Sequence, residues 1–536
     1  MPGFWIDTYV SSGNMKGLRY RRVNRVNQEE QTKQRAEDLN NSRNLDVHKW
    51  SEYPEVKNAV DELFQKFLEL PDFKGKQNLQ KKHIKVIVLD LYVRYKEDAK
   101  GYISFYRMKG MYRGKSRYNQ LHISFTSVSV IDNLAILGYL EQVKGHHDRT
   151  KQRASHMSRM RAKVKLIDFI FKEHKITPEM VERHPHTECV ILKDKDENGK
   201  KIVVTYTDTA ATNAMRTNLN VYNNLLRRTH IDIPWFPAKG VRSRSGNSLI
   251  KTDRSNKFTR RIFNNHSWED GGRYYGGWWQ GTPKDWRKKI LLDGSRAVEI
   301  DYSGLHIVLL YALEGTDYWQ TVAEDPYRLE GYEESERMRS LLKQVLLTSI
   351  NGESKQNALG AIQKEVNFNK DEYQWVIDEG IDLGELIDKF SKTHSPISKY
   401  FFSGHGVKLQ NLDSNIAEMI VNEFTRREIP VLCIHDSFIV PSQYKDDLLV
   451  SMKKAFRKAL SNAYPEWKSI VPKVDELMER INIIEAEELQ FEDITDDYDT
   501  PPSISMTLKG YAGDKYCASL KEHRNNTWDR GYYSSP

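Results

Sequence analysis

Apolar residues recur along the chain with two periods, and these predict a mixture of helices and strands. The alternation of Leu121, Ile123 and Phe125 predicts a short strand, and segment 127–145, which opens on a serine and closes on a glycine, predicts a helix. The dense apolar run 83–95 fits either a buried strand or a helix. This half of the chain favours a plain α+β scaffold over a winged-helix module.

Two strand-type runs in the C-terminal half lead directly to acidic residues. Residues 298–300 predict a short strand that ends at Asp301, and an apolar helical face follows it within segment 302–315. Residues 431–434 and 438–440 predict a β-hairpin whose tip carries the polar trio "HDS", with Asp436 at its centre. Each aspartate is therefore expected to sit on a rigid element.

A third segment, 335–352, predicts an amphipathic helix with a continuous apolar stripe. Arg339 and Lys343 lie four residues apart on another face of this helix. Two fixed cations side by side suit the binding of a triphosphate. The alternative is the solvated basic edge of an ordinary amphipathic helix.

Composition describes an ordinary globular protein, with 536 residues, 39% hydrophobic residues and a net charge of +8. No apolar run is long enough for a membrane span or a secretory signal, so we expect a cytoplasmic protein that does not enter a membrane. Its three cysteines are far apart, which suggests neither a zinc knuckle nor a disulfide framework and fits a reducing compartment.

Charge is unevenly distributed. Residues 149–165 carry seven Lys/Arg and no acid, and residues 239–261 carry eight Lys/Arg against one acid. Residues 485–499 carry eight acids and no base. The basic stretches indicate either nucleic-acid binding or a solvated charged face.

These patterns predict four regions. Residues 1–50 form a flexible arm, and residues 51–250 form a nucleic-acid-binding and thumb-like region that ends in a Gly-, Ser- and Arg-rich linker. Residues 251–446 form the region in which candidate chemistry lies. Residues 447–536 form a C-terminal helix followed by an acidic, partly disordered tail.

The two strand-end aspartates together suit divalent cations. Mg²⁺ takes oxygen ligands, usually one or two carboxylates with substrate phosphates, and a pair of such ions serves phosphoryl transfer. Asp301 and Asp436 are therefore candidate metal ligands and catalytic residues, with Mn²⁺ expected to substitute for Mg²⁺.

The order of these segments resembles motifs A, B and C of the superfamily that contains family A DNA polymerases and phage-type single-subunit RNA polymerases. "DYSGLH" resembles the motif D-x-S-x-x-E, "RSLLKQVLLTSING" resembles R-x-x-x-K-x-x-x-x-[TG]-x-x-x-G, and "IHDSF" resembles the His-Asp hairpin. The likeness covers about residues 264–441. It implies a right-hand polymerase, with an antiparallel palm sheet, helical fingers and thumb, beside an N-terminal α/β nucleic-acid-binding region.

The resemblance also implies roles for single residues. Asp301, the Tyr302 carbonyl and Asp436 would bind two metal ions, and Arg339 with Lys343 would hold the incoming nucleoside triphosphate. The remaining residues would touch the primer–template duplex: Arg273 at the minor groove, Gln410 near template or primer, and His435 at the primer end.

Two positions depart from the family pattern. Asn351 replaces the aromatic residue that stacks at the insertion site, and His306 falls where DNA polymerases have glutamate and RNA polymerases have glycine. A bulky His306 would exclude a 2′-hydroxyl, or it is simply a histidine satisfied at the start of a helix.

The sequence thus predicts a template-directed nucleotidyltransferase, a DNA polymerase without a proofreading exonuclease, acting as a monomer on a DNA primer–template with nucleoside triphosphates. The alternatives are an RNA polymerase or primase on the same palm, a replication-initiator type DNA-binding protein with an inactive palm, and a nuclease.

Overall fold

The computed structural model of this chain describes residues 39, 42–112, 116–145, 156–234, 236, 241–242, 249–250, 254–316, 318, 322 and 324–463. Most of the predicted flexible arm and of the predicted acidic tail lie outside the described residues. The chain divides into two compact units. Unit 1 runs to residue 115 and continues over 121–184, and unit 2 comprises 116–120 and everything from 185 onward. The domain boundary predicted near residue 250 falls inside unit 2.

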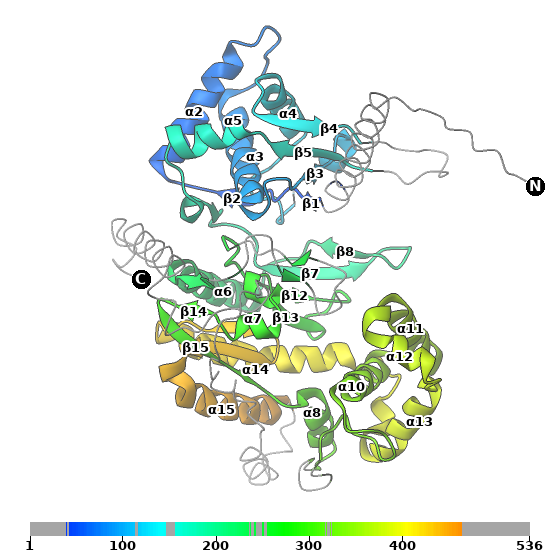
Figure 1. The fold of residues 1–536 in the computed structure, drawn as a ribbon. Helices are drawn as coiled ribbons and strands as arrows, with labels where there is room; N and C mark the ends of the chain where they lie inside the picture. The colour runs from blue at the N-terminus through cyan, green and yellow to red at the C-terminus, as the bar shows by residue number, and fades with distance from the viewer. Residues whose placement is uncertain are drawn as a thin grey trace, which may run out of the picture. The chain divides into compact units, whose positions relative to one another are not determined.

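Unit 1 is built on a four-stranded sheet with the order β1-β3-β5-β4 (Figure 1). The strands are β1 (Arg43–Asn44), β3 (Ile103–Phe105), β4 (Leu140–Val143) and β5 (Ser158–Ala162). β1 runs parallel to β3, and the other neighbours are antiparallel. A separate antiparallel pair joins β2 (Lys49–Trp50) and β6 (Glu182–Arg183).

Helices supply most of the core of unit 1. They are α2 (Pro54–Leu68), α3 (Gln77–Glu97), α4 (Thr126–Ile136) and α5 (Val164–Ile167). The ambiguous run 83–95 lies in α3, where apolar residues on all sides are buried against α2, α4 and the sheet, as expected of a central helix.

Two elements expected in unit 1 were predicted wrongly. The strand at 121–125 does not form, because His122 adopts a left-handed φ of 49° that interrupts an extended backbone. The helix expected across 127–145 ends at Ile136, since Gly138 takes φ 78° and its N–H donates to the Ala135 carbonyl, as at many helix C-termini. The chain then continues into β4.

Unit 2 contains two larger sheets. The first has the order β13-β12-β7-β8 and consists of β7 (Val190–Lys195), β8 (Lys201–Val204), β12 (Arg260–Phe263) and β13 (Gly271–Tyr275). Its β12 and β7 are parallel, and its other pairs are antiparallel. The helix α6 (Ala210–Arg228) packs beside β7, and a small hairpin joins β10 (Val241–Arg242) to β11 (Leu249–Ile250).

The second sheet of unit 2 is antiparallel throughout, with the order β16-β17-β15-β14-β9. Its strands are β9 (Ile231–Asp232), β14 (Leu291–Leu292), β15 (Ser295–Asp301), β16 (Leu432–Ile434) and β17 (Ser437–Pro441). β15 and the β16–β17 hairpin confirm the predicted strand and hairpin. All five residues of β17 are buried, which anchors the hairpin in the core of the unit.

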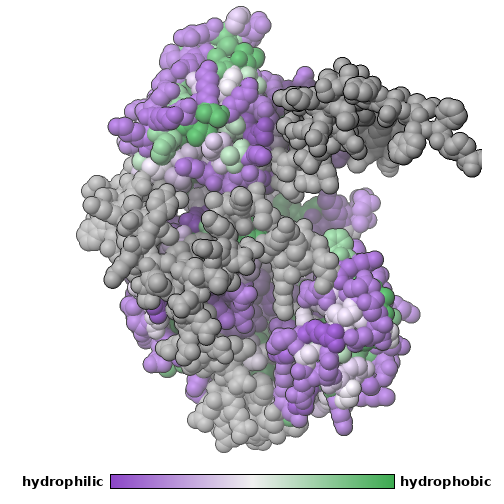
Figure 2. Space-filling view, viewed as in Figure 1, coloured by the Kyte–Doolittle hydropathy of each residue, from purple (hydrophilic) through white to green (hydrophobic). Residues whose placement is uncertain are grey.

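Besides α6, the described residues of unit 2 form further helices. They are α7 (Lys284–Arg287), α8 (Leu305–Leu313), α10 (Glu336–Asn351), α11 (Lys355–Phe368), α12 (Lys370–Asp378), α13 (Leu383–Thr393), α14 (Gly406–Arg426) and α15 (Lys445–Ala463). In Figure 1, α10 to α13 cluster beside α8 and one end of α14. Figure 2 shows a mostly hydrophilic outer surface over α11 to α13. The helices α8 and α10 confirm the two helices that the sequence predicted in these segments.

Short helical turns connect these elements: Lys109–Tyr112, Asp168–Glu173, Pro178–Met180, Trp278–Gly281, Ser395–Tyr400 and Ser442–Tyr444. The architecture is therefore mixed α and β with several small sheets, compatible with the α+β class. Over the described residues, none of the helices combines the length and the hydrophobicity that crossing a bilayer would require.

Candidate functional site

Asp301 and Asp436 lie side by side at the end of the second sheet of unit 2. Asp301 is the last residue of β15 and pairs in register with Ser437, the first residue of β17. The backbone N–H of Tyr302 donates to the carbonyl of Asp436 at 3.3 Å, which holds the two chain segments together. The strand ladder therefore brings together the two carboxylates that the sequence singled out.

Negative charges on both Asp301 and Asp436 at once are electrostatically unfavourable. Burial, followed by the negative charge of Asp436, raises the pKa of the Asp301 carboxyl well above its usual range, and Lys343 opposes the shift. Oδ1 of Asp301 is buried and has no hydrogen-bond partner among the described residues. A buried carboxylate oxygen without a donor is costly, unless a cation binds it.

These features fit a divalent cation. Carboxylate and carbonyl oxygens are the ligands of Mg²⁺ and Mn²⁺, and the unpartnered Asp301 oxygen is available. In the part of the chain that the structure describes, no three or more His, Cys, Asp or Glu residues are grouped to hold a metal ion. Asp301, Asp436 and the Tyr302 carbonyl would therefore hold the cation together with ligands from a substrate.

Buried contacts fix the backbone around the two aspartates. The Tyr302 side chain is buried and its hydroxyl donates to the carbonyl of Met452 on α15 at 2.6 Å. Glu299, two residues before Asp301, accepts two hydrogen bonds from Arg287 at 3.1 and 2.7 Å. The Ser437 hydroxyl donates to the same carboxylate at 3.2 Å. The β17 side of the hairpin is thus tied to β15.

His435 occupies the tight turn beside Asp436 with a left-handed φ of 57°. Its ring centroid lies 5.3 Å from that of Tyr275, and its buried Nδ1 finds no hydrogen-bond partner within the described ranges. Burial, reinforced by the positive charge of Arg273, lowers the pKa of His435. The imidazole is therefore neutral at pH 7 and retains a ring nitrogen for a further polar contact.

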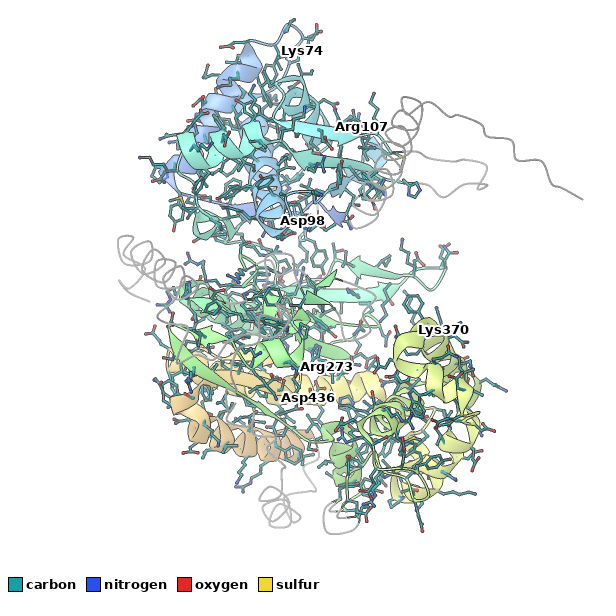
Figure 3. The ribbon with its side chains drawn as sticks, viewed as in Figure 1. Lys74, Asp98, Arg107, Arg273, Lys370 and Asp436 are labelled. Atoms are coloured by element: carbon teal, nitrogen blue, oxygen red, sulfur yellow. The ribbon has the colours of Figure 1, made fainter. Side chains whose placement is uncertain are left out.

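Arg273, on β13, lies next to this turn but is bound to a residue that the sequence analysis did not select (Figure 3). Its Nε donates to Oδ1 and Oδ2 of Asp413, on α14, at 3.1 and 2.8 Å. The Asp413 side chain is fully buried. Burial opposes the charge of Arg273, but Asp413 and, more weakly, Asp436 raise the pKa of its guanidinium.

His306 completes this cluster from the first turn of α8. Its Nε2 lies 2.9 Å from Oδ2 of Asp413 and 3.0 Å from Nη2 of Arg273. A guanidinium can only donate and a carboxylate can only accept, so a neutral His306 bonds one of them at a time through Nε2. The structure therefore joins two predicted residues, Arg273 and His306, through Asp413.

A sequence signal for Asp413 exists. The buried face of α14 carries Leu409, Ile416, Ala417 and Ile420, and Asp413 lies four residues after the first and three before the second. An acidic residue inside an apolar helical stripe requires a partner, because an unpaired buried charge is costly. The pattern indicates a buried partner, although it does not identify Arg273.

Arg339 and Lys343 lie on the same face of α10, as predicted, and share an aromatic neighbour. The Arg339 guanidinium and the Lys343 ammonium each lie 5.3 Å from the ring centroid of Tyr327. Arg339 is also paired with Asp325. Within the described residues Lys343 has no carboxylate partner, and its charge acts on Asp301.

Tyr327 is a further residue that the sequence analysis missed. Burial raises its pKa, and the negative charges of both Asp436 and Asp301 contribute to that shift. Its buried phenol therefore lies within electrostatic reach of the aspartate pair and in contact range of the two α10 cations. No motif marks this tyrosine, because it belongs to the connection that precedes α10.

The remaining predicted residues lie at helix ends. Asn351 is exposed at the end of α10, and its amide donates to the Leu347 carbonyl at 2.7 Å. It lies against Gly406, at the start of α14, where an added Cβ would approach its Oδ1 to 1.6 Å. Gln410 is half-buried on α14 one turn before Asp413.

A cleft of about 720 Å³ lies along α14 at a different set of residues. Its lining includes Lys408, Asn411, Asn415 and, from α15, Lys458. Neither Asp301 nor Asp436 lines it. The aspartate pair and its surroundings, and not this cleft, therefore form the candidate site.

Comparison of the sequence with models of protein families and with curated proteins found no match to either.

Proposed function

We propose that the chain is a template-directed nucleotidyltransferase that extends the 3′-hydroxyl of a DNA primer with nucleoside triphosphates. The observation that carries the proposal is the juxtaposition of Asp301 and Asp436 at the end of one sheet, with a buried Asp301 oxygen that no described residue hydrogen-bonds. Bound Mg²⁺ would supply neutralisation of the triphosphate charge and activation of the attacking hydroxyl at this point.

The α10 cations support the same reaction. The Lys343 ammonium has no carboxylate partner in the described part of the chain and its charge acts on Asp301, so a triphosphate bound there would lie between a cation and the aspartate pair. Arg339 would join it by exchanging the Asp325 carboxylate for a phosphate. Tyr327, between the two cations and near the aspartates, would form the apolar wall of the nucleotide site.

The cluster of Arg273, His306 and Asp413, with His435 beside it, would contact the primer–template. His435 is neutral and keeps a ring nitrogen for the primer end. Arg273 and His306 are held by Asp413, and His306 would limit the space beside the sugar of the incoming nucleotide. A ribonucleotide-specific polymerase or primase is the alternative outcome, favoured by the "HDSF" hairpin.

The test is extension of a labelled primer on a DNA template with Mg²⁺, with dNTPs and rNTPs in separate reactions. We expect wild type to extend with dNTPs, and Asp301→Ala and Asp436→Ala each to lose roughly a hundredfold or more of the rate. Asp388→Ala is the matched control, because it removes only the exposed ion pair with Lys355. Undiminished extension by either active-site variant would refute the proposal, and extension with rNTPs alone would favour the alternative.

A further inference from the structure

Unit 1 carries a cluster of exposed large apolar side chains between β3 and α4. Tyr106, Met108, Met111 and Phe125 are 41%, 52%, 49% and 38% exposed. The other exposed large apolar residues of unit 1, at Leu68, Ile136, Val164 and Phe171, are dispersed over different helices. A concentration of large apolar side chains at one place on the surface marks an interaction site.

The local structure holds this cluster together. Residues Lys109–Tyr112 form a helical turn closed by the Met111 N–H donating to the Met108 carbonyl at 3.1 Å. The Tyr112 hydroxyl donates to the Tyr106 carbonyl at 2.7 Å, and the Tyr112 ring lies 6.0 Å from that of Phe125 in an edge arrangement. The exposed rings of Tyr106 and Phe125 are thus tied to one framework through Tyr112.

The charge around the cluster is positive. Arg107, which lies within the cluster segment (Figure 3), is bound to Asp132 and to Gln142 on β4, and this pairing neutralises Asp132. Lys109 and Lys144 are exposed and, within the described residues, have no carboxylate at ion-pair distance. The positive charge of Lys144 acts on Asp132, the partner of Arg107, so Lys144 lies on the same edge of unit 1 as Arg107.

We propose that this surface, formed by Tyr106, Met108, Lys109, Met111 and Phe125, binds single-stranded nucleic acid. Exposed aromatic rings stack on unpaired bases, and flexible methionine side chains pack against base faces of any sequence. Exposed lysines beside them neutralise backbone phosphates. A paired duplex hides its base faces, so the rings favour a single strand over a duplex.

The charge also argues for this occupant over a protein surface. Lys109 and Lys144, which have no carboxylate partner among the described residues, complement a polyanion, and the neighbouring Asp132 is already paired with Arg107. The site lies in unit 1 and does not need the Asp301–Asp436 site to be active. It gives the chain a place to hold a template strand or a free strand independently of chemistry.

The test uses the full-length chain in EDTA and measures fluorescence anisotropy of a labelled 20-nucleotide oligothymidine and of a labelled 20-base-pair duplex. The double variant Tyr106→Leu/Phe125→Leu removes both rings but keeps apolar bulk. We expect it to weaken single-strand binding about 5- to 100-fold, as loss of stacking does elsewhere. The variant Lys109→Glu should flatten the salt dependence of binding by about one unit of slope.

The matched control is Phe171→Leu, which changes an exposed ring of unit 1 that contacts Lys96 but lies on the turn after α5. It should bind within about twofold of wild type, well short of the loss expected from a stacking ring. Photocrosslinking of an oligonucleotide that contains 5-iodouracil to the wild-type chain should label peptides within residues 104–126. That readout does not depend on the folding of any variant.

Several results would overturn the inference. These are wild-type affinity in the double variant, equal losses for single strand and duplex, or crosslinks confined to other peptides. If the double variant bound the oligonucleotide like wild type but lost affinity for a protein partner, the surface would be reassigned to protein binding. Asp436→Ala should bind the single strand like wild type, and the double variant should extend a saturating primer–template like wild type, so the two proposals fail separately.

Discussion

The carboxylate of Asp413 fixes the guanidinium of Arg273. Nε of Arg273 donates to both carboxylate oxygens at 3.1 and 2.8 Å, and Asp413 is completely shielded from solvent. The same carboxylate lies 2.9 Å from Nε2 of His306, so one buried charge on α14 aligns side chains from β13 and α8. Removal of one partner of a buried pair is more costly than the pair is stabilising, because it leaves a charge unpaired.

Asp413→Asn should therefore destabilise the protein and alter selection of the nucleotide sugar. We expect a loss of about 3 kcal/mol in the free energy of unfolding, measured by chemical denaturation. The ratio of dNTP to rNTP incorporation should fall, because His306 is no longer held. Glu418→Gln is the control, since it breaks another arginine–carboxylate pair on α14, with Arg261 at 2.6 Å, that does not involve His306. An unchanged ratio of dNTP to rNTP incorporation in Asp413→Asn would show that the cluster of Asp413, Arg273 and His306 does not select the sugar.

The elements around the aspartates were predictable because their signals are local. Apolar alternation and the polar trio at the turn identify β15 and the β16–β17 hairpin, and the order of the motifs identifies Asp301 and Asp436. The partners of Arg273 and His306 were not predictable, since Asp413 lies more than a hundred residues away in sequence. The strand predicted at 121–125 is wrong for a similar reason: Leu121 and Ile123 alternate because both belong to a small buried cluster with Val86, and the segment has no strand pairing in the part of the chain that the structure describes.

Substitutions on α10 should separate the roles of its two cations. Lys343→Ala should raise the KM for the nucleotide about tenfold, because the loss of one charge-assisted hydrogen bond weakens binding by about that factor. Asp325→Asn should lower the KM instead, because it frees Arg339 for the triphosphate. Steady-state kinetics of single-nucleotide incorporation gives both values. Arg337→Ala, on the same helix but paired with Glu333 and Glu379, should leave KM unchanged. An equal KM in Lys343→Ala and wild type would contradict the proposed nucleotide site.

The turn between Asp301 and α8 depends on Gly304. This residue adopts φ 62°, and an added Cβ would approach Cγ of Pro326 to 2.7 Å. Gly304→Ala should therefore lower the free energy of unfolding by about 1–3 kcal/mol, measured by denaturant titration. Gly360→Ala on α11 is the matched control, because its Cβ position is open and its φ is helical. It should stabilise the protein by about 0.5–1 kcal/mol. Equal effects of the two substitutions would show that the turn tolerates a side chain.

Unit 1 contains an acidic group whose ionisation should make stability depend on pH. Burial opposes the charge of Asp46, but Arg183, Lys49 and His48 outweigh it and lower the pKa of the carboxyl below its ordinary value of 3.8. The Arg183 guanidinium lies 2.8 Å from Oδ2, and the His48 N–H donates to Oδ1 at 3.1 Å. Asp46 therefore binds protons less tightly in the folded state than in the unfolded state.

The direction of the pH dependence follows from that difference in proton binding. The stabilisation is fully present above the unfolded pKa near 3.8 and is lost as pH falls through the lower folded pKa. Asp46→Asn should lower the free energy of unfolding by about 2 kcal/mol at pH 7, and the gap to wild type should narrow below about pH 4. Calorimetry from pH 7 to pH 3 measures both. Asp168→Asn, which removes only an exposed pair with Lys172, should stay within about 0.5 kcal/mol of wild type. If the difference in free energy of unfolding between wild type and Asp46→Asn stayed constant or widened toward pH 3, Asp46 would not be an ionised partner of Arg183 in the folded protein.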